Sequence, residues 1–274
     1  MEPKLQRRVQ RYGWDRAAEH YATFWAEQLR PAHEAAIRLA DPQAGEHVID
    51  VACGGGEVTF EVADRVGLEG SVLGVDISEK MVAVAQAEAA SRGSTNTSFR
   101  RSDAESLDCD DASFDLALCS LGLMYVLEPA VAAAEMRRAL RPNGRIAVSV
   151  WGQRRNCGWA ELFPIVDRRV KSDVCPMFFF LGAPGAIEAT LENAGFVDVD
   201  VTRLEVNLAY RDDSEAIGAA FLGGPVALPF GRFGEDDRRE VEREYLESIA
   251  AFRDGDGYLV PGEFVIATAT REPI

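Results

Sequence analysis

The sequence has few histidines, few cysteines and no long apolar run. Its five cysteines form no CxxC pair and its three histidines stand at positions 20, 33 and 47, so no zinc-site spacing is present. No apolar run approaches the roughly 18 residues that span a bilayer, and the polar N-terminus lacks the apolar segment of a signal peptide. We therefore expect a cytoplasmic protein with reduced thiols, no metal site and no membrane insertion.

Positive charge is also scarce. Lysine and arginine together number 29 against 45 acidic residues, and the formal net charge is −16. Nucleic-acid binding depends on a basic face that releases counterions from the phosphate backbone, and such a face is hard to build here. The 47% of hydrophobic residues and 27% of charged residues are ordinary for a globular protein. We expect a globular domain that does not bind nucleic acid.

What the sequence does contain, from Gly45 onward, is a regular alternation of apolar strands and amphipathic helices. Ser78 is a good N-cap for the second of these helices and Gly93 is a good terminator. Strands separated by helices of about 10–15 residues predict right-handed βαβ units and a parallel sheet. The predicted strands are 48–52, 71–76, 97–101, 114–120 and 145–151, and the predicted helices are 58–66, 79–92 and 129–140.

The flanking segments follow other patterns. Apolar residues at helical spacing in 14–40 predict one or two helices, broken near Pro31. After Trp151 we expect further helices and two long alternating strands, with a helical insert between those strands that covers the sheet edge. The segments are a helix at 158–170, an aromatic loop at 171–183, a helix at 184–195, a strand at 196–208, the insert at about 208–260 and a strand at 263–271.

The stretch "VIDVACGGGE", Val48 to Glu57, places three glycines directly after the first predicted strand. Glycine-rich turns between a parallel strand and a helix build nucleotide pockets, because the backbone can approach the ligand and the helix offers free N–H groups. The dinucleotide fingerprint GxGxxG fits poorly, since Ala52 stands where its first glycine would be and residue 59 is a threonine. The loop therefore predicts a nucleoside site without a pyrophosphate.

Two acids at the ends of later strands sharpen this prediction. Asp76 ends the second predicted strand, 20 residues after Gly56, and Asp103 follows the third. A carboxylate at the first position accepts hydrogen bonds from ribose hydroxyls, and one at the second can accept a bond from an adenine amino group. Together the two acids describe an adenosine pocket.

The successive motifs resemble those of class I S-adenosylmethionine-dependent methyltransferases, nearest to the type-11 and ubiquinone/menaquinone C-methyltransferase-like branch. The motifs are "VIDVACGGGE", "GVDISEKM", "RSDAESL", "FDLALCS" and "LRPNGRIAVSVW". This resemblance covers about residues 12–152. It implies an α/β, Rossmann-like, mostly parallel seven-stranded sheet with helices on both faces. We accordingly divide the chain into an N-terminal helical lid (1–44) and a methyltransferase domain (45–274), which has a cofactor half (45–152) and an acceptor half (153–274).

The resemblance also implies how S-adenosylmethionine would be held. The loop after the first strand would surround the methionine half, Asp76 would hold the ribose, and Asp103 would read the adenine edge. Tyr21 would close over the cofactor from the N-terminal helix. Ala52 departs from the family's usual glycine, which should cost only a little backbone freedom. The implied cofactor-binding residues are Tyr21, Asp50, Ala52, Cys53, Gly54, Asp76, Ile77, Met81, Asp103, Ala104 and Ser120.

The acceptor side is much less defined. A positioned base would add roughly 10²–10⁴-fold to the rate if the acceptor must lose a proton, and the candidate catalytic residues are His20 and Tyr125. Either could equally be structural. An apolar acceptor pocket could be lined by Met124, Trp151, Trp159 and Phe179, although plain core packing explains these residues as well.

Three functions remain open from the sequence. The leading hypothesis is methyl transfer by in-line displacement to a small, partly apolar or aromatic metabolite, such as a quinone precursor or natural-product intermediate. A nicotinamide-dependent oxidoreductase and a non-catalytic module that binds S-adenosylmethionine are the alternatives. The insert at 208–260 could act as an acceptor lid or as the interface of a homodimer.

Overall fold

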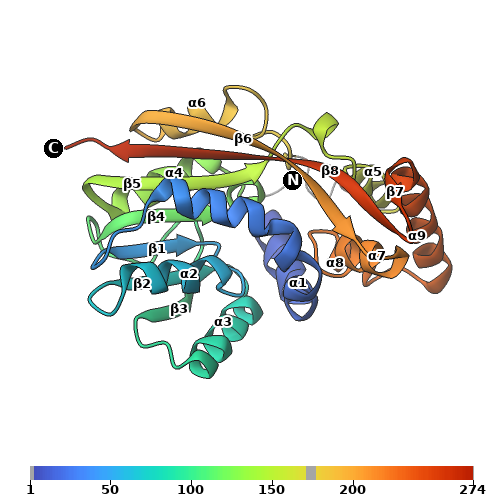
Figure 1. The fold of residues 1–274 in the computed structure, drawn as a ribbon, viewed down its shortest axis with the longest axis horizontal. Coiled ribbons are helices and arrows are strands. Elements are labelled where there is room, and N and C mark those ends of the chain that lie inside the picture. Colours follow the sequence, from blue (N-terminus) through green and yellow to red (C-terminus); the bar gives the residue numbers. More distant parts are fainter. Residues whose placement is uncertain (1–2, 171–176, 274) are drawn as a thin grey trace.

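A mixed β-sheet forms the centre of the structure, and helices cover both of its faces (Figure 1). The computed structural model describes residues 3–170 and 177–273. The strands are β1 (His47–Val51), β2 (Ser71–Asp76), β3 (Thr97–Arg101), β4 (Phe114–Ser120), β5 (Leu140–Trp151), β6 (Phe196–Tyr210), β7 (Arg253–Asp254) and β8 (Gly257–Arg271). The α-helices are α1 (Pro3–Ala40), α2 (Glu57–Val66), α3 (Glu79–Arg92), α4 (Pro129–Ala139), α5 (Leu162–Asp167), α6 (Ala186–Asn193), α7 (Asp213–Phe221), α8 (Ala227–Phe230) and α9 (Glu235–Ile249).

The strand order confirms the predicted topology. Seven strands follow the order β3-β2-β1-β4-β5-β8-β6, and the two-residue strand β7 pairs with β8 outside this path. The first five strands are parallel, whereas β8 runs antiparallel to both β5 and β6. The order reverses direction between β1 and β4, and in open α/β sheets this is the point where ligands bind, outside the carboxyl ends of the strands.

Alternating side chains of the parallel strands pack against different helices. On one face, Ile37 of α1 and Val62 of α2 pack with Val48, Val72 and Leu116. The intervening residues of the strands belong to a larger apolar cluster that also contains the buried residues of α4, α5 and α6. Burial on both faces explains why these strands are continuous apolar runs rather than alternating ones.

The helix ends after β2 follow the sequence signals closely. Ser78 caps α3, its hydroxyl accepting the Met81 N–H at 3.1 Å. Gly93 ends the helix in the left-handed region at φ 64°, which glycine adopts without a steric penalty. Residues 141–144, between the helix predicted at 129–140 and the strand predicted at 145–151, form an irregularity inside β5, and Asn143 there adopts a φ of 64°.

The prediction of a break near Pro31 was wrong. Helix α1 runs without interruption through Pro31. A proline removes one helical hydrogen bond, but Leu29, Ala32 and Ala36 on either side of it are buried in the core. Tertiary packing thus holds the helix together. The helix predicted at 158–170 is also shorter than expected and becomes α5, while residues 171–176 of the predicted aromatic loop lie outside the described residues.

The insert between β6 and β8 contains α7, α8 and α9, gathered at the end of those strands beside α1 (Figure 1). Two side chains of α1 connect it to this region. Trp25 Nε1 donates a hydrogen bond to the Ala219 carbonyl oxygen at 3.1 Å, and the Gln28 amide pairs with both backbone groups of Ala209. Helix α1 therefore links the insert to the carboxyl edge of the sheet.

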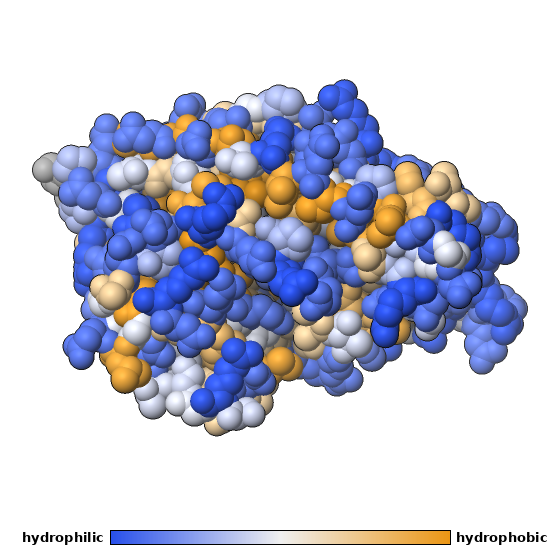
Figure 2. Space-filling view, in the orientation of Figure 1, coloured by the Kyte–Doolittle hydropathy of each residue, from blue (hydrophilic) through white to orange (hydrophobic). Residues whose placement is uncertain are grey.

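Hydrophilic side chains cover most of the face seen in Figure 2, with a band of hydrophobic ones across its middle. Among the described residues, no helix has the length and apolar character needed to cross a membrane.

Candidate active site

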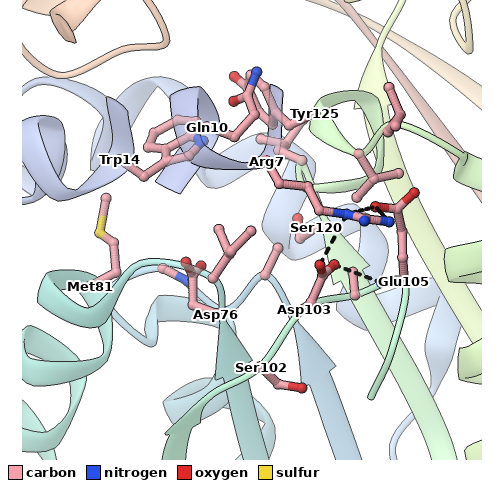
Figure 3. Close-up of a pocket in the computed structure, with 18 of the residues that line it drawn as sticks. Arg7, Gln10, Trp14, Asp76, Met81, Ser102, Asp103, Glu105, Ser120 and Tyr125 are labelled. Carbon is pink, nitrogen blue, oxygen red and sulfur yellow. Dashed lines mark hydrogen bonds and ion pairs between the residues drawn. The ribbon is translucent and has the colours of Figure 1, made fainter. Parts of the chain in front are cut away.

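A cavity of about 790 Å³ lies at the carboxyl ends of β1, β2, β3 and β4, beneath the first half of α1 (Figure 3). Each parallel strand delivers its last residues to this edge of the sheet, as the order of the strands requires. Nine of the predicted cofactor residues line the cavity: Tyr21, Ala52, Gly54, Asp76, Ile77, Met81, Asp103, Ala104 and Ser120.

The loop after β1 forms one wall of this cavity. Ala52, Gly54 and Gly56 all adopt positive φ angles, of 59°, 54° and 95°. A side chain on Gly54 would point at the Tyr21 ring, 3.8 Å away, and would fill the space between the loop and α1. Glycine at position 54 thus leaves room for a ligand between α1 and the loop.

Ala52 and Gly122 form a close contact on the other side of this loop. A Cβ built on Gly122 would lie 2.4 Å from the Ala52 Cβ, so position 122 accepts no side chain while alanine stands at 52. Ala52 also keeps the left-handed conformation that glycine adopts more readily. The alanine at position 52 therefore adopts a conformation that the glycine implied by the family resemblance would reach at lower cost.

Asp76 is buried at the end of β2 and its carboxylate organises two loops. Its Oδ2 accepts the Gly54 N–H at 3.0 Å and its Oδ1 accepts the Ser78 N–H at 2.8 Å. Burial raises the pKa of Asp76 to about 6, against the opposing effect of these two hydrogen bonds. The remaining lone pairs of this carboxylate can accept bonds from vicinal hydroxyl groups.

Asp103 and Glu105, in the loop after β3, contact the start of α1. Arg7 Nε donates to Glu105 Oε2 at 2.8 Å and lies 3.2 Å from Asp103 Oδ2, and Figure 3 shows the guanidinium between the two carboxylates. Glu105 Oε1 also accepts the Glu128 N–H at 2.8 Å. These bonds hold α1 across the mouth of the cavity.

A second, smaller cavity of about 260 Å³ adjoins the first and shares Tyr21, Ala52, Gly54 and Ser120 with it. It also contains Asp50 and Cys53, the two predicted cofactor residues that the larger cavity lacks, together with His33 and Glu57. This position beside the glycine loop is where the methionine half of the cofactor was predicted.

The groups around the smaller cavity favour a positively charged ligand. Thr59 Oγ1 donates to Asp50 Oδ2 at 2.6 Å, and burial raises the pKa of Asp50 to about 7. Burial also raises the pKa of Glu57 and lowers that of His33 to about 4, so this imidazole is neutral at physiological pH. A nearby cation would stabilise the ionised form of both carboxyl groups.

Three aromatic side chains close the cavity on the side of α1. The Trp14 ring stands edge-on to Tyr21 at 5.7 Å and to Tyr125 at 5.0 Å between ring centroids. Tyr125 in turn contacts Phe178 at 5.4 Å. These rings form an aromatic wall of the cavity that Ser120 also lines.

The predicted acceptor-side residues are placed differently. Tyr125 lines the larger cavity, whereas His20 faces away from it and lines another cavity between α1 and the insert. Met124, Trp151 and Trp159 are buried in the main apolar cluster, and Phe179 packs against it. Among the described residues that line the larger cavity, none of these four appears.

Several lining residues were not predicted from the sequence. From α1, these are Arg7, Gln10 and Trp14, whose spacing places them on the face that also carries Tyr21. That spacing was a usable signal, but the helix was expected to begin only at residue 14. The others follow β3 and β4: Ser102, Glu105, Leu121, Gly122, Val126 and Leu127.

The residues present fit S-adenosylmethionine. The buried carboxylate of Asp76 suits the ribose, and the glycine at position 54 leaves room for the ligand. The smaller cavity, with Asp50 and Glu57, suits the positively charged ammonium and sulfonium groups of the methionine half. In this fit the adenosine would lie at Asp76 and Asp103 and the methionine half at Asp50, with Ser120 on the way to the aromatic wall.

Comparisons with known proteins agree with this geometry. A family profile described as a methyltransferase domain matches residues 42–164. Nocamycin O-methyltransferase from Saccharothrix syringae is 31% identical over 261 residues, which cover 88% of this chain and 91% of that relative. A demethylmenaquinone methyltransferase from Shouchella clausii is 37% identical over 110 residues, or 40% of this chain and 47% of the relative.

A solved structure supports the fold. The YcgJ protein from Bacillus subtilis superimposes with a TM-score of 0.62 at 18% identity, covering 89% of this chain and all 100% of that one. None of these matches supports a nicotinamide-dependent oxidoreductase or a non-catalytic binding module. The chain is an enzyme that uses S-adenosylmethionine, and it belongs to the class I S-adenosylmethionine-dependent methyltransferase family.

Proposed function

We propose that this enzyme methylates an oxygen atom of a small, partly apolar or aromatic metabolite, and that this oxygen is already ionised when it binds. The observation that carries the proposal is the lining of the larger cavity, where Trp14 and Tyr125 stand and no histidine, lysine or cysteine is among the described residues. His33 and Cys53 line the smaller cavity, but burial lowers the pKa of His33 to about 4 and raises that of Cys53, so neither is a good proton acceptor near neutral pH. The match to nocamycin O-methyltransferase over nearly the whole chain supports oxygen as the acceptor atom.

Bound S-adenosylmethionine supplies an electrophilic methyl group on a sulfonium centre. The protein's part is to hold the donor and acceptor in line, which gains most of the rate from proximity and orientation. Asp76 and the loop at Gly54 would fix the adenosine, and Asp50 and Glu57 would face the charged end of the cofactor. Trp14 and Tyr125 would exclude water from the acceptor side.

Because no suitable base is found in the described wall, we infer that the acceptor is a group that loses its proton without the help of the enzyme. Burial raises the pKa of the Tyr21 hydroxyl well above its ordinary value, so this hydroxyl is a poor proton acceptor near neutral pH. Asp76 accepts two backbone N–H groups and is assigned to the ribose. A carboxylate, an acidic enol or an acidic phenol needs no base, because it has lost its proton before binding.

The demethylmenaquinone methyltransferase match does not favour carbon as the acceptor, because it covers only 40% of this chain. Transfer of a labelled methyl group to a panel of aromatic carboxylic acids, acidic phenols, amines and thiols tests the proposal. We expect product with the acidic oxygen compounds alone. Product confined to amines, thiols or ring carbons would overturn the choice of acceptor atom.

Two variants test the predicted catalytic residues. Tyr125→Phe keeps the aromatic ring, so if Tyr125 only forms the wall, kcat should stay within about threefold. A loss of about 100-fold or more, with a shifted pH profile, would instead restore Tyr125 as the base. His20→Gln should leave kcat unchanged, because His20 lines a different cavity.

A further inference from the structure

A separate cavity of about 670 Å³ lies between α1, α3 and the insert. Arg16 and His20 come from α1, Lys80 from α3 and Arg238 from α9, while Phe221 and Phe230 form part of an apolar floor. In Figure 1 the lower part of α1 stands between α3 and α8, with α9 beyond. Nothing in the methyltransferase site described above uses this cavity.

Two guanidinium groups meet in this cavity at Gly231. Arg238 Nη2 donates to the Gly231 carbonyl oxygen at 3.0 Å, and Arg16 Nε lies 3.1 Å from where a Cβ on Gly231 would stand. Two like charges gathered around one residue repel each other, and an anion beside them would offset that repulsion. The arrangement is unusual in a chain with a formal net charge of −16.

Neither guanidinium has an acidic partner among the described residues. Arg16 makes no hydrogen bond or ion pair there, and the buried Arg238 Nε has no hydrogen-bond acceptor. Glu235 and Asp236 in the first turn of α9 pair with Arg239. A buried donor without an acceptor costs free energy that a bound anion would recover.

The rest of the wall is also more cationic than acidic. Lys80 Nζ lies 3.6 Å from Glu19 Oε1, the single carboxylate among the lining residues described. The Arg238 guanidinium stacks over the Phe230 ring at 5.4 Å from its centroid, so a cationic edge adjoins an aromatic floor. Guanidinium groups bind carboxylates and phosphates through paired, charge-assisted hydrogen bonds.

We propose that this cavity is a second ligand site, which binds a small organic anion through Arg16 and Arg238 and places the apolar body of that anion on Phe221 and Phe230. The ligand carries a carboxylate or a phosphate group on an apolar or aromatic body. Positions 16 and 20 lie on a different face of α1 from positions 7, 14 and 21, which line the cofactor cavity. The site is therefore separate from the methyl-transfer site and does not depend on the proposed acceptor.

Isothermal titration of the full chain at fixed ionic strength tests the site directly. The probes are phenylacetate, phenyl phosphate, inorganic phosphate and neutral benzyl alcohol. We expect the two aromatic anions to bind, inorganic phosphate to bind more weakly and benzyl alcohol not to bind. Whichever aromatic anion binds more tightly identifies the charged group. Equal binding of benzyl alcohol, or no binding of any anion at millimolar concentrations, would overturn the proposal.

Variants separate this cavity from other places where an anion could bind. Arg16→Gln and Arg238→Gln should each weaken the better probe about tenfold. Arg38→Gln, at an exposed position of α1, and Arg155→Gln, at an exposed position after β5, are the matched controls and should leave its affinity unchanged. S-adenosylmethionine affinity should be the same in all four variants, which verifies their folding. Unchanged probe affinity in both test variants would place the anion elsewhere and refute the site.

Discussion

At the scale of single residues, Asp76 has a structural role, and we propose for it a role in cofactor binding that depends on its protonation. Burial raises its pKa from the ordinary value to about 6. Between pH 4 and 6 the folded protein therefore binds more protons than the unfolded chain, and this group's contribution to the free energy of unfolding falls as the pH rises. Above pH 6 the carboxylate is ionised and best able to accept ribose hydroxyls.

We therefore predict that the affinity for S-adenosylmethionine increases as the pH is raised from 5 to 7.5. Over the same range, the ionisation of Asp76 should lower the stability of the ligand-free protein. Asp76→Asn should weaken binding about 10–100-fold, because a charged acceptor is lost, and it should remove the part of the pH dependence centred near pH 6. Titration calorimetry across this pH range measures the affinity of the wild type and of Asp76→Asn and shows how each depends on pH. A wild-type affinity that does not change with pH would contradict the assignment.

The contact between Ala52 and Gly122 gives a second prediction at this scale. Gly122→Ala should destabilise the protein by about 1–3 kcal/mol, because its Cβ would overlap with that of Ala52. Ala52→Gly removes the obstructing atom and also suits the positive φ at this position. Adding Ala52→Gly to Gly122→Ala should therefore recover most of the loss in thermal denaturation, whereas additive losses would show that the two positions do not share this space.

At the scale of elements, a row of α1 side chains four residues apart holds the helix over the cofactor cavity. Arg7 pairs with Glu105, Arg11 with Glu79 at 3.2 Å, and Asp15 accepts the Ser78 hydroxyl at 2.7 Å. A fourth pair, Glu19 with Lys80, continues the row. All of these partners belong to loops and helix starts at the cavity edge, and we therefore predict that α1 acts as a lid that moves when the cofactor enters or leaves.

This row predicts how the first turns of α1 affect cofactor release. Arg7→Gln removes the ion pairs to Asp103 and Glu105, and it should raise the dissociation rate of S-adenosylmethionine about three- to tenfold with a much smaller change in Tm. Arg8→Gln, at the adjacent exposed position, is the control and should release the cofactor at the wild-type rate. An unchanged rate in Arg7→Gln would show that these bonds do not restrain release.

The same elements show how far the sequence could predict the structure. Signals that act within a few residues, such as Ser78 and Gly93 around α3, were sufficient because the cap bonds are local. The lid contact of Arg7 with Glu105 joins residues 98 positions apart, and no local pattern indicates such a pair. The roles of Trp151 and Trp159 were ambiguous for a related reason. A tryptophan looks the same in the sequence whether its side chain lines a pocket or fills the core.

At the scale of the whole molecule, charge links the acidic surface to the choice of ligand. The formal net charge is −16, and Asp50, Glu57 and Asp76 lie around the two joined cavities. S-adenosylmethionine carries a net charge of about +1 and S-adenosylhomocysteine a net charge of about 0, because the latter lacks the sulfonium. A negatively charged cleft attracts S-adenosylmethionine but exerts almost no net electrostatic attraction on S-adenosylhomocysteine. A homodimer formed through the insert at 208–260 stays a prediction.

The association rate of S-adenosylmethionine should therefore fall about three- to tenfold as ionic strength rises from about 0.02 to 0.5 M, since salt shortens the range of the attraction. S-adenosylhomocysteine, of nearly the same size and shape, is the control and should associate at a rate that salt barely changes. Stopped-flow fluorescence can follow both, because Trp14 lines the cavity; a Trp14→Phe variant verifies the source of the signal. Equal salt dependence for the two ligands would mean that salt acts on the opening of α1 rather than on the attraction of the cation.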